Sequence, residues 1–120
     1  MGMTHVTVIV RNPASPDQTW EGLFMVDTGA WDTLVPGKYL KQIGLSPKAK
    51  RTYELADGSE VKMDITVGEL EFMGDIVGNT IIFGDDNAEP ILGVTALESA
   101  GIEVDPRSQQ LKRLPAARLK

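Results

Sequence analysis

The chain has 120 residues, of which 42% are hydrophobic and 24% charged, the length and composition of one globular domain. Its 17 acidic and 12 basic residues give a net charge of −5, so a surface that holds nucleic-acid phosphate is not expected. The absence of cysteine excludes disulfides, thiol nucleophiles and cysteine metal sites, and the single histidine, His5, excludes sites with two imidazoles.

The first half of the chain predicts two strands followed by a helix. Alternating β-branched residues over 5–11 predict a strand. The two prolines within 12–17 predict a loop, because proline lacks the amide proton that strand pairing uses. A second strand is predicted over 20–26. A helix is predicted over 36–43, with a proline at its start and Gly44 at its end.

The second half predicts a series of hairpins. An Asp-Gly pair separates two strand-like runs, which predicts a tight turn whose two residues both tolerate positive φ. After a break at Gly68-Glu69 the sheet is expected to continue, and the chain is expected to end in a last hairpin. The strands are predicted over 52–56, 59–67, 70–72, 75–83, 102–104 and 109–114.

A second helix is predicted after an acidic loop. The loop, 84–89, lacks the spacing and the glycine of an EF-hand, so it is interpreted as a solvated loop rather than a calcium site. The helix is predicted over 95–99, where Thr95 and Glu98 have the spacing of a capping box, and Gly101 is expected to end it.

One pattern occurs twice: an apolar strand, a glycine turn and a short helix. The first copy contains Val26 and Gly29, and the second is Ile91-Leu92-Gly93 with the helix after it. The chain is therefore predicted to form a single mostly-β domain, residues 1–120, with an approximate internal two-fold. Residues 115–120 are expected to form a loose tail.

The segment Val26-Asp27-Thr28-Gly29-Ala30 points to chemistry. A carboxylate, a hydroxyl and a glycine follow a strand that has the pattern of a buried one. The carboxylate is thus held at a rigid strand end, and the glycine lets backbone amides and a partner approach closely. An Asp-Thr-Gly can also form an Asx turn that has no function. The triplet alone leaves both interpretations open.

Together with the segments around it, this motif resembles the retropepsin-like aspartic peptidases, single-lobe enzymes related to retroviral proteases and to half of a pepsin. The matching segments are Val26-Asp27-Thr28-Gly29-Ala30, Asp32-Thr33-Leu34, the flap-like Leu55-Ala56-Asp57-Gly58-Ser59, and Ile91-Leu92-Gly93 before a helix with Leu97. The resemblance extends from the first strand to about Leu114. It departs at Trp31, often a small or acidic residue in the family, and at Asp57, which puts a charge on the flap tip.

The resemblance implies a fold and a site. The fold is a closed, barrel-like single lobe of the acid-protease type, with one or two short helices and a flap hairpin. The implied catalytic residues are Asp27, Thr28 and Gly29. The implied substrate-binding residues are Ala30, Trp31, Asp32, Ala56, Asp57 and Gly58. The implied apolar support beneath the catalytic loop is Ile91, Leu92 and Gly93.

A count of carboxylates then implies a dimer. An aspartic peptidase needs two carboxylates in one site, and the chain has one Asp-Thr-Gly. The second must be Asp27 of another copy, which implies a two-fold homodimer. The strands over 102–104 and 109–114 fit either a buried edge or a dimer interface, and the resemblance implies the interface. The expected function is an aspartic endopeptidase that cuts extended peptides or unfolded proteins between apolar residues. No metal or other cofactor is expected, and the optimum is expected on the acidic side.

Two other interpretations remain open. One is a non-catalytic dimer of the same fold that binds peptides or serves in assembly, favoured by Trp31 and by the charge of Asp57. The other is a monomeric β-domain in which Asp27 is only a turn residue. The start of the chain lacks a signal-peptide pattern, and no apolar run is long enough to span a membrane. A cytoplasmic protein that binds neither membranes nor nucleic acid is therefore expected.

Overall fold

The computed structural model describes residues 4–116 and residue 119, which form strands and two short helices. The elements are β1 (His5–Asn12), β2 (Ser15–Val26), β3 (Thr33–Pro36), α1 (Gly37–Gln42), β4 (Ala49–Glu54), β5 (Glu60–Phe72), β6 (Asp75–Gly84), β7 (Ile91–Leu92), α2 (Val94–Ala100), β8 (Ile102–Val104) and β9 (Leu111–Arg113).

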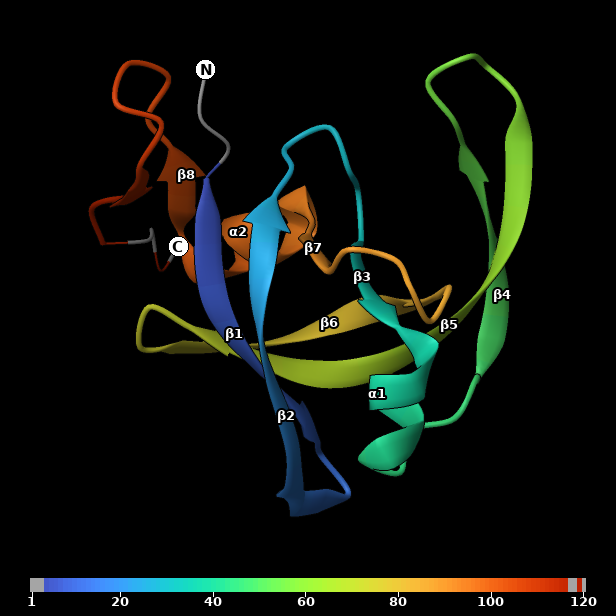
Figure 1. The fold of residues 1–120 in the computed structure, drawn as a ribbon. Helices are drawn as coiled ribbons and strands as arrows, with labels where there is room; N and C mark the ends of the chain where they lie inside the picture. Colours follow the sequence, from blue (N-terminus) through green and yellow to red (C-terminus); the bar gives the residue numbers. More distant parts are fainter. Residues whose placement is uncertain (1–3, 117–118, 120) are drawn as a thin grey trace.

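The strands of the main sheet close into a ring. The seven-stranded sheet has the order β1-β2-β7-β3-β6-β5-β4, and β1 also pairs with β5. The ring therefore closes through β1 and β5, and β4 alone stays outside it (Figure 1). This arrangement confirms the prediction of a mostly-β, closed and barrel-like lobe with two short helices.

The hydrophobic core fills the inside of this ring. Strand residues that alternate along β1 point inward, as do side chains of the other ring strands and both helices. The fully or almost fully buried side chains include Val8, Val10, Phe24, Leu40, Leu70 and Leu97. The core thus gives the ends of the ring strands a rigid base.

Two strand pairs interlock the halves of the chain. β2 runs through the loop 27–32 into β3, and β3 pairs in parallel with β6. β6 runs through the loop 85–90 into β7, and β7 pairs in parallel with β2. Each short strand is followed by a helix, α1 or α2. Each half therefore supplies a short strand to the long strand of the other half.

The hairpin of β4 and the first part of β5, which we call the flap hairpin because the sequence analysis predicts a flap there, projects from the ring. β4 pairs with the first part of β5, from Glu60 to Ile65, whereas β6 pairs with β5 only from Ile65 onward. The turn end of the hairpin, which precedes Ile65 in the chain, is not paired with β6 and consequently extends away from the barrel. It lies on the same side as the loop 27–32 (Figure 1).

Three predictions about strands were wrong in detail. β2 begins at Ser15, so the predicted loop 12–17 is a short turn; Pro16 is tolerated because this end of β2 pairs with β1 alone. β3 was not predicted at all. β5 runs without a break through Gly68, where we expected an interruption. A Cβ at Gly68 would lie 2.9 Å from Ile81 Cδ1 and 3.4 Å from the Arg11 carbonyl oxygen, so this glycine permits close strand approach.

Two predictions about turns and caps were also wrong. In the flap turn only Gly58 has positive φ, 87°, and the Gly58 N–H donates to the Leu55 carbonyl. This geometry is a three-residue hairpin loop rather than a two-residue one. The capping box of Thr95 and Glu98 does not form: the N-cap of α2 is Gly93, without a side-chain cap. The turn residue Gly101 does end α2, with φ 69°.

The last hairpin, β8 and β9, forms a separate two-stranded sheet beside the N-terminal end of β1. The Thr4 hydroxyl donates to the Gln109 carbonyl, which links the hairpin to the start of β1. The predicted tail, 115–120, lies partly outside the described residues. No helix in the described part of the chain is long and apolar enough to cross a membrane.

Candidate active site

Asp27 lies at the end of β2, held by the strand beside it. Its backbone N–H donates to the Leu92 carbonyl at 3.1 Å, which continues the pairing of β2 with β7. Its carboxylate Oδ1 accepts the Gly29 N–H at 2.9 Å. The side chain is half-buried, and Thr28 and Gly29 are exposed. A carboxylate is therefore fixed at a rigid strand end and remains accessible from solvent.

The loop 27–32 rests on the start of α2. The Ala30 carbonyl accepts the Val94 N–H at 2.8 Å, and the Trp31 carbonyl accepts the Thr95 N–H at 3.2 Å. The Thr95 hydroxyl donates to the same Trp31 carbonyl at 3.0 Å. These bonds satisfy amides that the first turn of a helix leaves unpaired, which is why α2 needs no capping box.

The predicted support residues lie directly against this loop. Leu92 is fully buried. A Cβ on Gly93 would lie 2.5 Å from the Asp32 carbonyl carbon and 2.8 Å from the Trp31 carbonyl oxygen, so only glycine leaves room for the loop. The Gly93 N–H donates to Thr33 Oγ1 at 3.1 Å. Ile91 is half-buried and lines the groove described next.

A groove of about 740 Å³ lies between the loop 27–32 and the flap hairpin. It begins at Gly29, close to Asp27 along the chain, and runs to Leu55 near the flap turn. Its apolar lining is Ala30, Trp31, Leu34, Leu55, Val61, Met63, Ile82 and Ile91. A groove of this volume and lining accommodates apolar side chains.

The flap-tip residues lie at the exposed end of the hairpin. Ala56, Asp57 and Gly58 are exposed and do not line the groove. The Asp57 carboxylate accepts hydrogen bonds from the Ser59 N–H at 2.9 Å and the Ser59 hydroxyl at 2.6 Å, and these bonds hold the pKa of Asp57 below its ordinary value. The charge at the flap tip is thus engaged within the turn itself.

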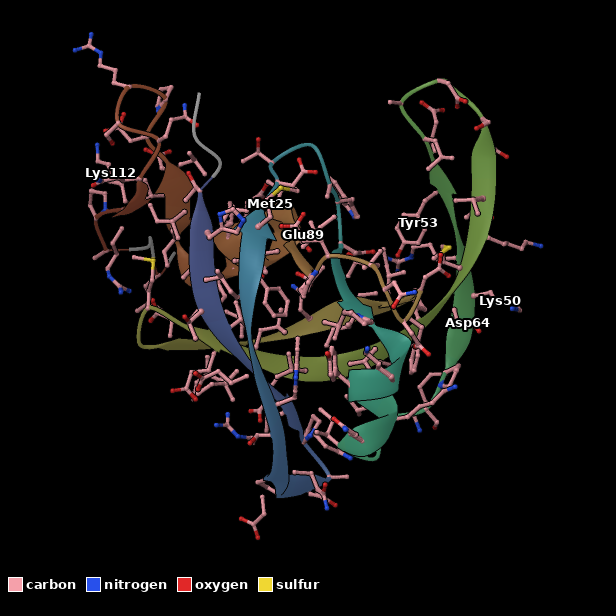
Figure 2. All side chains as sticks on the ribbon, in the orientation of Figure 1. Met25, Lys50, Tyr53, Asp64, Glu89 and Lys112 are labelled. Atoms are coloured by element: carbon pink, nitrogen blue, oxygen red, sulfur yellow. The ribbon has the colours of Figure 1, made fainter. Side chains whose placement is uncertain are left out.

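The inner face of β4 contributes groove residues that sequence reasoning missed. Arg51 and Tyr53 both line the groove. They are two residues apart on a strand, so their side chains lie on the same face. Figure 2 shows Tyr53 on the inner side of the hairpin and Lys50 on its outer side, where Lys50 forms an ion pair with Asp64 at 2.8 Å. The alternation of β4 could have indicated a shared face, but not what that face contacts.

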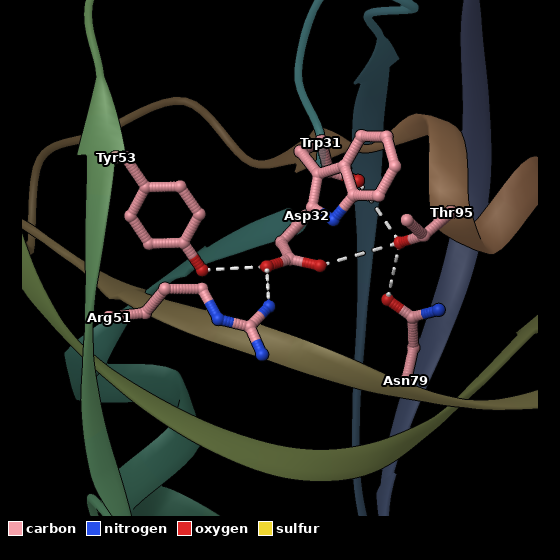
Figure 3. A network of polar contacts seen from close by, with 6 residues as sticks. All are labelled: Trp31, Asp32, Arg51, Tyr53, Asn79 and Thr95. Carbon is pink, nitrogen blue, oxygen red and sulfur yellow. Dashed lines mark hydrogen bonds and ion pairs between the residues drawn. The ribbon is translucent and has the colours of Figure 1, made fainter.

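Asp32 is the buried carboxylate of the loop. The residue is 4% exposed. Its Oδ2 accepts hydrogen bonds from Arg51 Nη1 and from the Tyr53 hydroxyl, both at 2.7 Å. Thr95 Oγ1 lies 3.4 Å from the other oxygen, Oδ1, and 3.2 Å from Asn79 Oδ1 (Figure 3). The prediction that Asp32 contacts substrate stays a prediction; within the chain, both of its oxygens already have partners.

These contacts change the acid–base properties of the β4 residues. Burial, and then the bond to Asp32, raise the pKa of Tyr53 well above its ordinary value. The hydrogen bond to Asp32, together with its negative charge, raises the pKa of Arg51. Tyr53 therefore stays a protonated donor, and Arg51 a cation, at neutral pH.

Trp31 is the large exposed side chain of the site. It is 63% exposed and lines the groove. No group of three or more histidines and carboxylates that could hold a metal occurs in residues 4–116 or at residue 119.

The sequence was compared with protein-family models and with curated proteins. Residues 20–99 match the model of a family described as gag-polyprotein putative aspartyl protease, so the match includes both Asp27 and Gly93. The chain belongs to this family. The interpretation as a retropepsin-like aspartic peptidase is thereby confirmed at the level of the family. No curated protein matches the chain.

Proposed function

We propose that the protein is an aspartic endopeptidase that acts as a homodimer, with the Asp27 carboxylates of two copies in one active site. The observation that carries this proposal is the placement of Asp27: a half-buried carboxylate at a strand end, anchored by the Gly29 N–H, beside an apolar groove under a hairpin. The family match over residues 20–99 supports the same chemistry.

The second carboxylate has to come from another copy. Asp32 is buried and bonded to Arg51 and Tyr53. Asp57 is bonded within its own turn. The sheet of β8 and β9 supports a dimer as well, because a two-stranded sheet with open edges is marginal on its own. We propose that this sheet forms part of the interface between the two copies.

The chemistry is that of a carboxylate pair sharing one proton. Two carboxylates about 3 Å apart cannot both ionise, as is established for aspartic proteases. The ionised Asp27 removes a proton from a water molecule as the water attacks the peptide carbonyl carbon. The protonated Asp27 donates a hydrogen bond to the carbonyl oxygen and then its proton, which gives a neutral tetrahedral species. The carboxyl that took the proton from water then gives it to the amide nitrogen, the C–N bond breaks, and the amine and the new carboxylic acid leave while the other Asp27 recovers a proton from the collapsing hydroxyl. Because the reaction needs one carboxyl of the pair to carry a proton, activity is highest on the acidic side of neutrality.

The groove defines the class of substrate. An extended peptide lies between the loop 27–32 and the flap hairpin, where backbone groups of both pair with it like neighbouring strands. Its apolar side chains contact residues such as Leu34, Met63 and Ile82. Closure of the turn Ala56–Gly58 over the peptide excludes water from the carboxylate pair.

The test is cleavage of a peptide library from acidic to neutral pH by the wild type and by Asp27→Asn. We expect Asp27→Asn to lower kcat at least about a hundredfold, the contribution of a general acid–base group. Its thermal unfolding should stay close to that of the wild type. Asp17→Asn is the matched control, because it makes the same chemical change at the exposed other end of β2 and should leave kcat unchanged.

Two results would contradict the proposal. Equal cleavage by the wild type and Asp27→Asn would show that Asp27 does not carry the reaction. Peptide binding without turnover at any pH would favour the non-catalytic dimer instead. A statine-type mimic of the tetrahedral species should inhibit the wild type and should bind Asp27→Asn much more weakly.

A further inference from the structure

The side chain of Asp32 connects two parts of the molecule that no strand pairing joins. Asp32 belongs to the loop 27–32, whereas Arg51 and Tyr53 belong to β4, the strand outside the ring. Both β4 side chains donate to the same oxygen, Asp32 Oδ2, at 2.7 Å. β4 pairs with β5, so these two bonds give it a second attachment, and that attachment is to the catalytic loop.

On its other side, Asp32 is fixed by the start of α2. Its backbone packs against Gly93, where a Cβ would lie 2.5 Å from the Asp32 carbonyl carbon. Its Oδ1 lies 3.4 Å from Thr95 Oγ1. The network therefore runs from α2, through the loop, to β4 (Figure 3). Asp32 has little freedom to follow β4 if that strand moves.

Breaking this attachment costs free energy, because the Asp32 carboxylate is buried. A buried carboxylate that loses its partners has a high desolvation cost, and removing one partner of such a pair is strongly destabilising. The Asp32 carboxylate is almost fully buried, with a side chain 3% exposed, whereas the Arg51 side chain is 43% exposed. Moving β4 away would leave the carboxylate buried without its donors. The part of β4 that carries Arg51 and Tyr53 is thus held in place.

Beyond Tyr53 the hairpin has no comparable attachment to any residue in the part of the chain that the structure describes. The hydrogen bonds of the turn, from Leu55 to Ser59 and from Gly58 to Leu55, stay within the turn, as do those of Asp57. Gly58, with φ 87° and no atom within 4 Å of its Cβ position, is not packed against anything. The hairpin is consequently held at its base and free at its tip.

We propose that Asp32, Arg51 and Tyr53 form a latch that fixes the base of the flap over the groove, so that opening and closing are confined to the segment beyond Tyr53. These are positioning residues: they act on peptide through the groove wall that they hold. The peptide-binding part of this inference rests on the proposed function, and the mechanical part does not.

A latch of this kind affects binding rather than chemistry. The wall of the groove contacts the peptide before and during the reaction, so loosening the wall removes interactions shared by the substrate and the transition state. A latch variant should raise KM and leave kcat nearly unchanged. A residue that only supports the fold would instead lower the amount of active enzyme, with KM preserved.

The experiment compares Tyr53→Phe, Asp32→Asn and the double variant with the wild type, by amide hydrogen exchange over 49–60 and by peptide-cleavage kinetics. Tyr53→Phe removes one hydroxyl and keeps the ring, so it tests the latch even if Asp32→Asn folds poorly. Asp64→Asn is the matched control, because it breaks the exposed pair with Lys50 on the outer side of the same hairpin.

For Tyr53→Phe we expect about three- to tenfold faster exchange in the hairpin and a similar rise in KM, the effect of losing one hydrogen bond to a charged group. For Asp32→Asn we expect a larger change in both, because this substitution weakens both bonds to β4. The fold-change in the double variant should be smaller than the product of the two single fold-changes, because both substitutions break the same contact between Tyr53 and Asp32. Asp64→Asn should exchange like the wild type.

The latch would be overturned if both single variants had the exchange rates and KM of the control. It would also be overturned if the fold-change in the double variant equalled the product of the two single fold-changes. The hydrogen-exchange measurement needs no catalysis. If the wild type cleaves no peptide, faster exchange in Tyr53→Phe still supports the latch while the proposed function fails. If the wild type cleaves peptide but the latch variants match Asp64→Asn, the latch fails and the proposed function stands.

Discussion

The loops 27–32 and 85–90 have equivalent places in the two interlocked halves, and each satisfies the start of the other half's helix by different means. The loop 27–32 uses backbone: the carbonyls of Ala30 and Trp31 accept the first amides of α2. The loop 85–90 uses a side chain: Asp86 Oδ1 accepts the Lys38 N–H at the start of α1, at 3.0 Å. The predicted solvated loop therefore also has a structural contact.

This difference in helix capping determines which of the two loops has a carboxylate oxygen available for a ligand. Because backbone carbonyls cap α2, the Asp27 side chain is not needed as a cap. Within residues 4–116 its hydrogen bond is the one from the nearby Gly29 N–H to Oδ1, so Oδ2 remains available to a ligand. Because a side chain caps α1, the Asp86 carboxylate is already engaged. Of these two loops, the loop 27–32 thus presents the carboxylate with an available oxygen, which supports our proposal that the second carboxylate comes from another copy.

The largest effect is expected from Gly93→Ala. The added Cβ would lie 2.5 Å from the Asp32 carbonyl carbon, so the loop 27–32 would have to move away from α2. We expect a loss of about 3 kcal/mol in the free energy of unfolding, typical of severe overpacking, together with loss of peptidase activity. Chemical denaturation measures the first effect.

Gly78→Ala, on β6, is the control for Gly93→Ala. No atom lies within 4 Å of the Cβ position of Gly78. Its free energy of unfolding should change by no more than about 0.5 kcal/mol. If Gly93→Ala were tolerated equally well, the close contact between the loop and α2 would not be what holds Asp27 in place.

A smaller effect is expected from Asp86→Ala, which removes the side-chain acceptor at the start of α1. The loss should be about 1 kcal/mol, as for other helix-capping residues. Asp85→Ala removes the same charge from the neighbouring exposed position and should cost markedly less. Equal losses in the two variants would mean that charge, and not the bond to Lys38, accounts for the effect. Neither variant should alter kcat.

The smallest effect expected is a pH-dependent loss of stability at Asp32. Like Asp86, this carboxylate accepts a hydrogen bond from a distant part of the chain. The Tyr53 hydroxyl that bonds it has a pKa raised above the ordinary value of 10.0. Above about pH 10 the unfolded chain releases this proton while the folded chain keeps it, so the stabilising contribution is lost as the pH rises. After allowance for screening by solvent, we expect a loss of a few tenths to about 1 kcal/mol.

Denaturation at about pH 8 and about pH 11 measures this loss as the difference between the wild type and Tyr53→Phe. Other titrating groups are shared by the two proteins, so they cancel in the comparison. The wild type should lose more stability than Tyr53→Phe between the two pH values. Parallel losses would show that the Tyr53 hydroxyl is not buried against Asp32.

The sequence was sufficient where local pattern decides structure. Alternation predicted β1, and proline and glycine signals predicted α1 and the ends of both helices, because these depend on residues close in the chain. The Asp27 segment and the order of motifs after it were sufficient to predict the family. The closed barrel followed from that resemblance and not from the strand patterns.

Contacts between distant residues decided the rest. β3 is short and pairs with β6, which lies far along the chain, so no local signal shows it. The capping box of Thr95 failed because the carbonyl of Trp31, 64 positions away, accepts its hydroxyl instead. The bonds from Arg51 and Tyr53 to Asp32 join a loop to a strand that follows an intervening helix. Residue spacing carries no information on such contacts.

The most direct test of the shared active site is to mix subunits. Wild type and Asp27→Asn are unfolded together in varying proportions, refolded at constant total concentration and assayed for peptide cleavage. If each active site needs Asp27 from two copies, activity falls as the square of the wild-type fraction, so an equal mixture retains about a quarter of the activity. Activity that falls in direct proportion, leaving about half in the equal mixture, would show that each copy works alone and would contradict the account.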